Sequence, residues 1–221
     1  MISKKILLLT LISFTTIISQ NKSALNIPKG KAVTIDGKIS GDEWKDALVC
    51  NLTGGGKLFL MHDGKYFFAA LQGTNNGWGH LYVANKENVN VLHASAALGK
   101  VIYVKDSSSA WNTRQNFTWS LRQTDNSEET NQARQKFLND EGWLANNNRT
   151  ANANELEYKI ALNFFDGSSP RIAVVYANSP DEFLFFPKEL NDDCLKKELV
   201  FGTTPADLHF NFSVWQLLHF D

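Results

Sequence analysis

Two stretches of the chain alternate hydrophobic and polar residues with a period of two. In residues 116–122 the apolar members are Phe117, Trp119 and Leu121, and residues 155–162 alternate in the same way. Successive side chains of a β-strand point to opposite faces, so this period predicts two strands that each have one covered and one solvated face. Trp119 is in phase with its apolar neighbours, and we expect it to lie in the core.

Two further runs, residues 57–62 and 65–71, are almost entirely apolar or aromatic, which is typical of strands covered on both faces. The Asp63-Gly64 pair between them favours a tight hairpin turn. A second hairpin and single strands complete the set, at residues 81–84 with 89–93, and at residues 101–105, 171–176, 183–186 and 208–214. Many short strands separated by turn residues predict an all-β fold, a two-sheet antiparallel β-sandwich of immunoglobulin-like or jelly-roll type.

One segment interrupts the strands. Residues 127–139 carry Glu128 and Glu129 early and Arg134 and Lys136 later, an order of charges that complements the dipole of a helix. The sequence therefore predicts one short helical insertion here. An Asn-rich polar loop is expected to follow it over residues 145–154.

The N-terminus has the layout of a secretory signal peptide. Lys4 and Lys5 precede an apolar run over residues 6–18, and the small residue Ser19 follows. The run of about 13 residues is shorter than the roughly 20 that a membrane-spanning helix needs, so an uncleaved anchor is the less favoured alternative. We expect residues 1–19 to be a signal peptide, residues 20–221 to form a single domain, and the mature protein to be secreted or periplasmic without a membrane span.

The charge balance argues against a surface that binds nucleic acid. Two of the 22 basic residues fall in the predicted signal. The remaining 20 basic and 23 acidic residues give the mature chain a net charge near −3. Such a balance gives no field for holding nucleic acid or an anionic membrane. No internal repeat or linker is evident, and we expect a monomer.

The chain contains two cysteines, Cys50 and Cys194. In an oxidising compartment they could pair and tie the start of the domain to its end, which is worth about 4 kcal/mol in the chain-entropy model. The alternative is two buried free thiols, because the sequence gives no distance between them.

Residues 33–47 read VTIDGKISGDEWKDA, which describes a strand, a turn at Asp36-Gly37 and a short helical turn carrying Trp44. This pattern resembles the opening of the family-nine carbohydrate-binding-module-like domains, secreted β-sandwiches related to the DOMON domains. Later segments resemble further landmarks of that family: residues 64–71, the strand EYKIAL at residues 157–162 with Ala161 in the place of the usual Pro, and Phe185-Phe186-Pro187. The resemblance extends over residues 33–187 and implies the same fold.

The resemblance also implies a non-catalytic module that binds carbohydrate. In sugar-binding members of the family, two Trp rings hold a sugar while amide and charged groups contact its hydroxyls. The C–H faces of a pyranose stack on aromatic rings, whereas its hydroxyls need directional hydrogen-bond partners. We therefore expect a glycan ligand held between Trp residues.

Three of the six Trp residues, Trp44, Trp119 and Trp215, stand in core-like settings. The other three lie among Gly, Asn and Ser or follow the predicted helix, and such loops can present a ring to a ligand. An aromatic lid over the end of the sandwich is the alternative for each. The candidate ligand-binding residues are Asn76, Trp78, His80, Trp111, Arg114 and Trp143. Trp78 and Trp111 are the expected walls of the cleft.

His80 and His93 suggest a haem- or metal-binding domain as the second interpretation, because related DOMON-type sandwiches include haem binders with Met or His ligands. Met61 and His62 are adjacent on a predicted strand and therefore point to opposite faces, so both cannot enter one pocket without a bulge. No group of His, Cys and Asp has metal-ligand spacing. The sequence thus predicts no metal ligand and identifies no cofactor.

An enzyme is the third interpretation, since His93 and Ser95 would share a strand face. The chain has no nucleophile elbow, no paired-carboxylate motif and no phosphate loop. We expect no catalytic residue and no enzymatic activity. An exported domain without a sugar site remains the alternative to a glycan-binding module.

Overall fold

The computed structural model describes residues 23–85, 87–121, 127–147, 154–165 and 170–220. The predicted signal peptide lies outside these residues, and so does most of the predicted Asn-rich loop.

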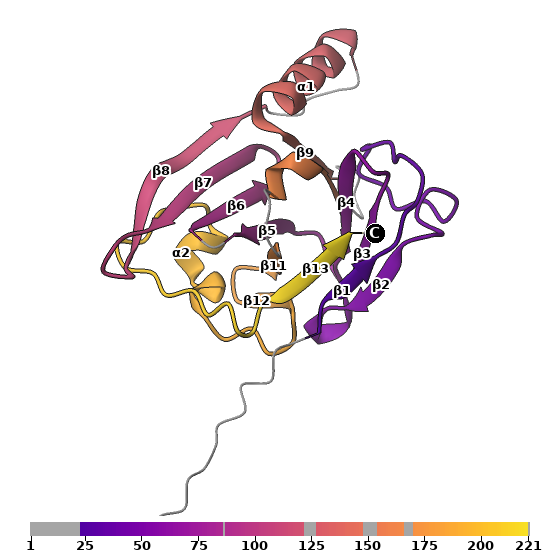
Figure 1. Cartoon of the computed structure of the whole chain (residues 1–221). Helices are drawn as coiled ribbons and strands as arrows, with labels where there is room; N and C mark the ends of the chain where they lie inside the picture. The colour runs from indigo at the N-terminus through magenta and orange to yellow at the C-terminus, as the bar shows by residue number, and fades with distance from the viewer. Residues whose placement is uncertain (1–22, 86, 122–126, 148–153, 166–169, 221) are drawn as a thin grey trace, which may run out of the picture.

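Two sheets pack face to face and form a sandwich (Figure 1). The larger sheet has the order β1-β13-β11-β5-β6-β7-β8, with β12 paired to β11. Its strands are β1 (Leu25–Ile27), β5 (Trp78–Ala84), β6 (Asn88–Ala94), β7 (Leu98–Lys105), β8 (Trp111–Ser120), β11 (Arg171–Ser179), β12 (Glu182–Phe186) and β13 (Gln216–Phe220). The smaller sheet has the order β2-β3-β4-β10-β9, with β2 (Leu48–Asn51), β3 (Lys57–His62), β4 (Tyr66–Gln72), β9 (Trp143–Asn147) and β10 (Glu155–Ala161). Apart from the parallel pair β1–β13, the ladders between these strands are antiparallel, which confirms the predicted all-β sandwich.

The predicted helical insertion is α1 (Glu128–Glu141), which ends two residues later than the charge pattern indicated. Ser127 caps its start by accepting a hydrogen bond from the Thr130 backbone N–H, and Gly142 ends it with a left-handed φ of 73°. The remaining helical turns are α2 (Lys197–Val200), η1 (Thr53–Gly55), η2 (Leu162–Phe165) and η3 (Asp193–Leu195).

Three segments that were predicted to be loops contain strand residues. Ala145 and its two successors were expected to open the Asn-rich loop, but they pair with β10 and extend β9 to Asn147. Trp78 and Trp111 were placed in loops, yet each is the first residue of a strand. In each case pairing with a neighbouring strand outweighs the weak strand preference of Gly and Asn.

The predicted strand over residues 208–214 is absent, because the described backbone there forms turns and irregular chain. Phe210 within this segment and Trp215 just after it are buried nonetheless. The Asp192 carboxylate holds this segment by accepting hydrogen bonds from the Asn211 backbone N–H at 2.8 Å and from Trp215 Nε1 at 2.7 Å. The apolar pattern therefore predicted correctly that residues in this segment are buried. They are buried in a loop that covers the sheet, and not in a strand.

Three apolar layers follow from this architecture. The first lies between the sheets and includes Phe67 and Tyr158. The second covers the outer face of the larger sheet, the face turned away from the smaller sheet, where residues of α2 and the C-terminal loops pack on β5, β6 and β7 (Figure 1). The third covers the outer face of the smaller sheet and contains Trp44 and Met61. Trp44 and Trp215 are 3% and 0% exposed, which confirms that both are core residues.

The opening motif is attached to the third apolar layer by one buried carboxylate. Glu157, on β10, accepts hydrogen bonds from the backbone N–H groups of Asp36 and Gly37 at 3.0 and 2.8 Å. Its other oxygen accepts from Trp44 Nε1 at 2.9 Å. Two sequence landmarks more than 100 residues apart, the Asp-Gly turn with its Trp and the EYKIAL strand, are thus one hydrogen-bonded unit.

Both cysteines are free thiols. Cys50 packs against the layer between the sheets, whereas Cys194 lies in the layer on the outer face of the larger sheet. The larger sheet separates the two sulfurs, so the structure has the alternative of two unpaired thiols.

Candidate functional site

Trp78 is half-buried at the start of β5. Its Nε1 donates a hydrogen bond to the Val200 carbonyl at 2.8 Å, and its ring lies 5.9 Å from the ring of Phe201, centroid to centroid. The register of Gly79 with Ala94 places Trp78 opposite Ser95, at the end of the sheet where β6 turns into β7. The Trp78 ring therefore packs against the apolar layer on the outer face of the larger sheet and is only partly open to solvent.

Trp111 lies at the opposite end of the same sheet. It pairs with Lys105, whereas Trp119 pairs with Gly99 at the far end of β7. The stretch of β7 from Gly99 to Lys105 measures about 20 Å at the usual rise per residue. The Trp111 ring is 9% exposed and packs edge-on against Phe210 and Phe212. Trp78 and Trp111 therefore do not face one cleft.

The other four predicted site residues divide by exposure. Trp143 and His80 are fully buried, and the Trp143 ring packs between Phe137 and Tyr158 inside the sandwich. Asn76 and Arg114 are exposed: Asn76 lies just before β5, and Arg114 lies within β8. A role in ligand binding stays a prediction for this set, and its members do not gather at one place.

Trp119 was predicted to be in the core, and this prediction was wrong: its side chain is 46% exposed. The period of two was correct, because Phe117 and Trp119 share a face and their rings stack at 5.5 Å. The exposure arises because β8 is the edge strand of the larger sheet. A period of two indicates which residues share a face, but it does not indicate whether another element covers that face.

Trp78, Phe117, Trp119 and Phe201 form an aromatic patch on the face of the larger sheet near its edge strand β8. Phe201 is 47% exposed, and its neighbour Gly202 lies against the Trp119 ring. Two of the three large hydrophobic side chains that are exposed among the described residues thus fall in this patch. Clustered exposed aromatic rings mark binding surfaces more often than isolated ones do.

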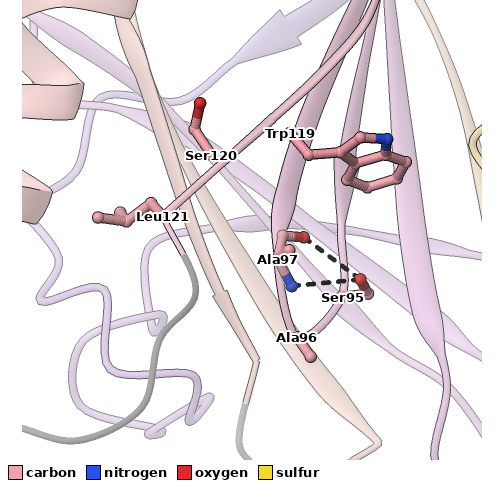
Figure 2. Close-up of a pocket in the computed structure, with 6 residues that line it drawn as sticks. All are labelled: Ser95, Ala96, Ala97, Trp119, Ser120 and Leu121. Carbon is pink, nitrogen blue, oxygen red and sulfur yellow. Dashed lines mark hydrogen bonds between the residues drawn. The ribbon is translucent and has the colours of Figure 1, made fainter.

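A cavity of about 520 Å³ opens beside the Trp119 ring. This volume is in the usual range for small-molecule sites. Figure 2 shows the ring standing beside the turn from β6 to β7, where Ser95 Oγ donates to the Ala97 carbonyl at 3.3 Å. The residues that line the cavity are Ser95, Ala96, Ala97, Trp119, Ser120 and Leu121. The lining therefore includes one exposed indole, that of Trp119, and two residues that carry a hydroxyl group, Ser95 and Ser120.

Beneath this patch, two buried histidines meet. His80 Nε2 lies 2.8 Å from the Val200 carbonyl oxygen, which can only accept, so the ring donates there. His93 Nδ1 lies 3.2 Å from the same nitrogen of His80. Burial lowers the pKa of His80 to about 4, and burial together with His80 lowers the pKa of His93 well below its usual value. Both rings are neutral at physiological pH.

Of the residues named for the haem or metal interpretation, His80 and His93 meet beneath the patch, whereas Met61 and His62 lie on the other sheet. Met61 points into the layer with Trp44, whereas His62 contacts the Phe220 ring at 5.7 Å, so the two occupy opposite faces as predicted. Within the described ranges, no group of three or more His, Cys, Asp or Glu could hold a metal ion. In the same part of the chain, no helix is long and apolar enough to cross a membrane.

Comparisons with known proteins place the fold. Neither a protein-family model nor a curated protein sequence matches the chain. A candidate carbohydrate-binding protein from Bacteroides uniformis is similar in structure, with a TM-score of 0.50 and 10% identity over 90% of this chain and 100% of that one. Two structures of family-nine carbohydrate-binding modules from Caldicellulosiruptor kristjanssonii, one with cellotriose and one with glucose, are also similar at 10% identity. Their TM-scores are 0.43 and 0.45, and they cover 88% and 90% of this chain and 92% and 96% of their own. The likeness to the Bacteroides protein supports the sandwich fold, and the link to the DOMON domains stays a prediction.

Proposed function

We propose that this chain is a secreted, non-catalytic module that binds carbohydrate in the cavity beside Trp119. The observation that carries the proposal is the half-exposed Trp119 ring at the border of a cavity that also holds Ser95 and Ser120. A pyranose needs an apolar surface for its C–H face and donors or acceptors for its hydroxyls, and this cavity offers both.

Trp78 is also proposed to contact the ligand, but as a neighbour of the stacking ring and not as one wall of a cleft shared with Trp111. Trp78 is not one of the residues that line the cavity, but it packs against Phe201 in the aromatic patch next to it. We propose Trp119 as the stacking ring and Trp78 with Phe201 as neighbouring apolar contacts. Trp111 and Trp143, which are buried elsewhere, are proposed to support the fold.

Binding is tested with residues 20–221 and a panel of soluble polysaccharides, by affinity electrophoresis followed by titration calorimetry of any ligand found. Trp119→Ala should abolish binding, because it removes the stacking surface. Val49→Ala is the matched control, since Val49 is 51% exposed and lies on β2 in the other sheet. Unchanged affinity of Trp119→Ala for a ligand that the wild type binds, or no binding across the panel, would overturn the proposal.

Secretion is the second part of the proposal and rests on the charged and apolar pattern of residues 1–19. Mass spectrometry of the protein recovered from its native host should find a mature chain that begins at or near Gln20. A chain that retains Met1 in the cytosol would contradict it.

A further inference from the structure

The Trp119 ring stands at the end of a straight row of residues that crosses four strands. The row runs through His80 on β5, His93 on β6 and Gly99 on β7 to Trp119 on β8, each paired with the next. Side chains of directly paired residues lie on the same face of a sheet. Gly99, which pairs directly with Trp119, has no side chain.

Gly99 leaves the space in which the indole lies. A Cβ atom at this position would be 2.7 Å from Trp119 Cζ3 and 2.8 Å from Cε3, closer than real Cβ contacts. The φ angle of Gly99 is outside the left-handed region, so the backbone does not require glycine here. Glycine is required at this position because any larger residue would collide with the Trp119 ring.

Gly202 borders the same six-membered ring at another edge. A Cβ there would lie 2.4 Å from both Cζ2 and Cη2 of Trp119. The turn that carries Gly202 is anchored two residues earlier, where the Val200 carbonyl accepts hydrogen bonds from Trp78 Nε1 and His80 Nε2, each at 2.8 Å.

His93 completes the slot. Its imidazole meets the Trp119 ring edge-on, with centroids 4.9 Å apart and planes at 81°. This is a favourable geometry for aromatic pairs. Because His93 is 4% exposed and Trp119 is 46% exposed, a buried ring supports an exposed one.

We infer that Gly99 and His93 are positioning residues of the proposed carbohydrate site: Gly99 provides the slot for the Trp119 ring, and His93 supports its edge. The inference rests on the proposed function. An exposed indole on an edge strand would otherwise sample several rotamers, and ordering it on binding would reduce affinity. The slot holds the ring upright beside Ser95 before the sugar arrives.

The experiment measures the affinity of residues 20–221 for the best polysaccharide of the panel, with the thermal midpoint of every variant. Gly99→Ala should bind at least about tenfold more weakly, because its methyl group displaces the ring. Gly41→Ala is the matched control, since a Cβ at Gly41 meets nothing within 4 Å. His93→Ala should also weaken binding by about tenfold, whereas His93→Phe, which keeps an edge-on ring, should restore affinity to within about threefold.

A double-mutant cycle separates positioning from general damage to the fold. In a Trp119→Phe background the smaller ring no longer reaches the Gly99 slot, so adding Gly99→Ala should cost less than half of what it costs beside Trp119. Equal costs in both backgrounds would overturn the inference, and so would wild-type affinity in Gly99→Ala and His93→Ala. If instead Trp119→Ala binds like the wild type, the proposed site itself has failed.

Discussion

Trp44 and Trp119 show how differently the two sheets of this protein use the same side chain. Trp44 lies on the outer face of the smaller sheet, is 3% exposed and donates its indole N–H to the buried Glu157 carboxylate. Trp119 lies on the outer face of the larger sheet and is 46% exposed, because β8 is an edge strand. The difference is one of cover: residues 33–47 fold over the smaller sheet, whereas the C-terminal loops cover β5 to β7 but leave the Trp119 ring half open.

The comparison predicts that Trp44 contributes to stability and Trp119 to recognition. The largest expected effect is that of Trp44→Ala, which should lower the free energy of unfolding by about 3–5 kcal/mol, as other buried aromatic truncations do. Part of this cost is the loss of the only side-chain donor to Glu157 from the opening motif. Urea denaturation measures it, and an unchanged midpoint would show that the ring is dispensable to the fold.

The buried histidines beneath the patch predict a pH dependence of stability. The folded-state pKa of His80, about 4, is below the usual value of 6.5, so the unfolded chain binds this proton first as the pH falls. Stability should therefore decrease from pH 6.5 toward pH 4, by about 3 kcal/mol for His80. His80→Gln keeps a donor for the Val200 carbonyl without titrating. The difference in unfolding free energy between wild type and this variant should change with pH in that window, and a constant difference would refute the assignment.

Glu157 gives the opposite pH dependence on the other side of the molecule. Burial raises the pKa of Glu157 to about 7, although the hydrogen bonds that it accepts from Gly37, Trp44 and Asp36 lower its pKa in part. The folded-state value is above the unfolded value of 4.5, so this contribution is fully present below pH 4.5 and decreases as the pH rises through 7. Glu157→Gln should cost about 1–3 kcal/mol at pH 5, because one acceptor oxygen is replaced by a donor. Chemical denaturation at pH 5 and pH 8 should find a smaller cost at pH 8.

The smallest expected effect on stability is that of Trp119→Ala, about 1 kcal/mol, because the ring is already half in water. The same variant should lose carbohydrate binding completely. A loss of stability as large as that of Trp44→Ala would mean that Trp119 is a packing residue, and the contrast between the two sheets would disappear.

Much of the fold could be predicted from local patterns. The Asp63-Gly64 turn joins β3 and β4 as expected, with Asp63 Oδ1 accepting from the backbone N–H groups of Lys65 and Tyr66. The helix over residues 127–139 and the burial of Trp44 also follow from sequence. These features depend on residues that are close in the chain, and propensity and period report them directly.

The site depended on information that no local pattern contains. The sequence placed Trp78 and Trp111 in two similar polar loops, but strand register separates them by the length of β7. It placed Trp119 in the core, because alternation identifies a face without identifying its cover. Gly99 gave no signal at all, since its role exists only through its pairing with Trp119 across the ladder.

The sequence by itself therefore determined many of the strands, the helix and the opening motif, because short-range periodicity and turn chemistry specify them. Only the tertiary structure decided which aromatic rings are open to solvent and which groups meet beside them. The physical reason is that exposure and contact depend on which distant segments pack on each sheet face. Residues 33–47 cover Trp44 and the C-terminal loops leave Trp119 half exposed, a difference that appears only once both sheets are assembled.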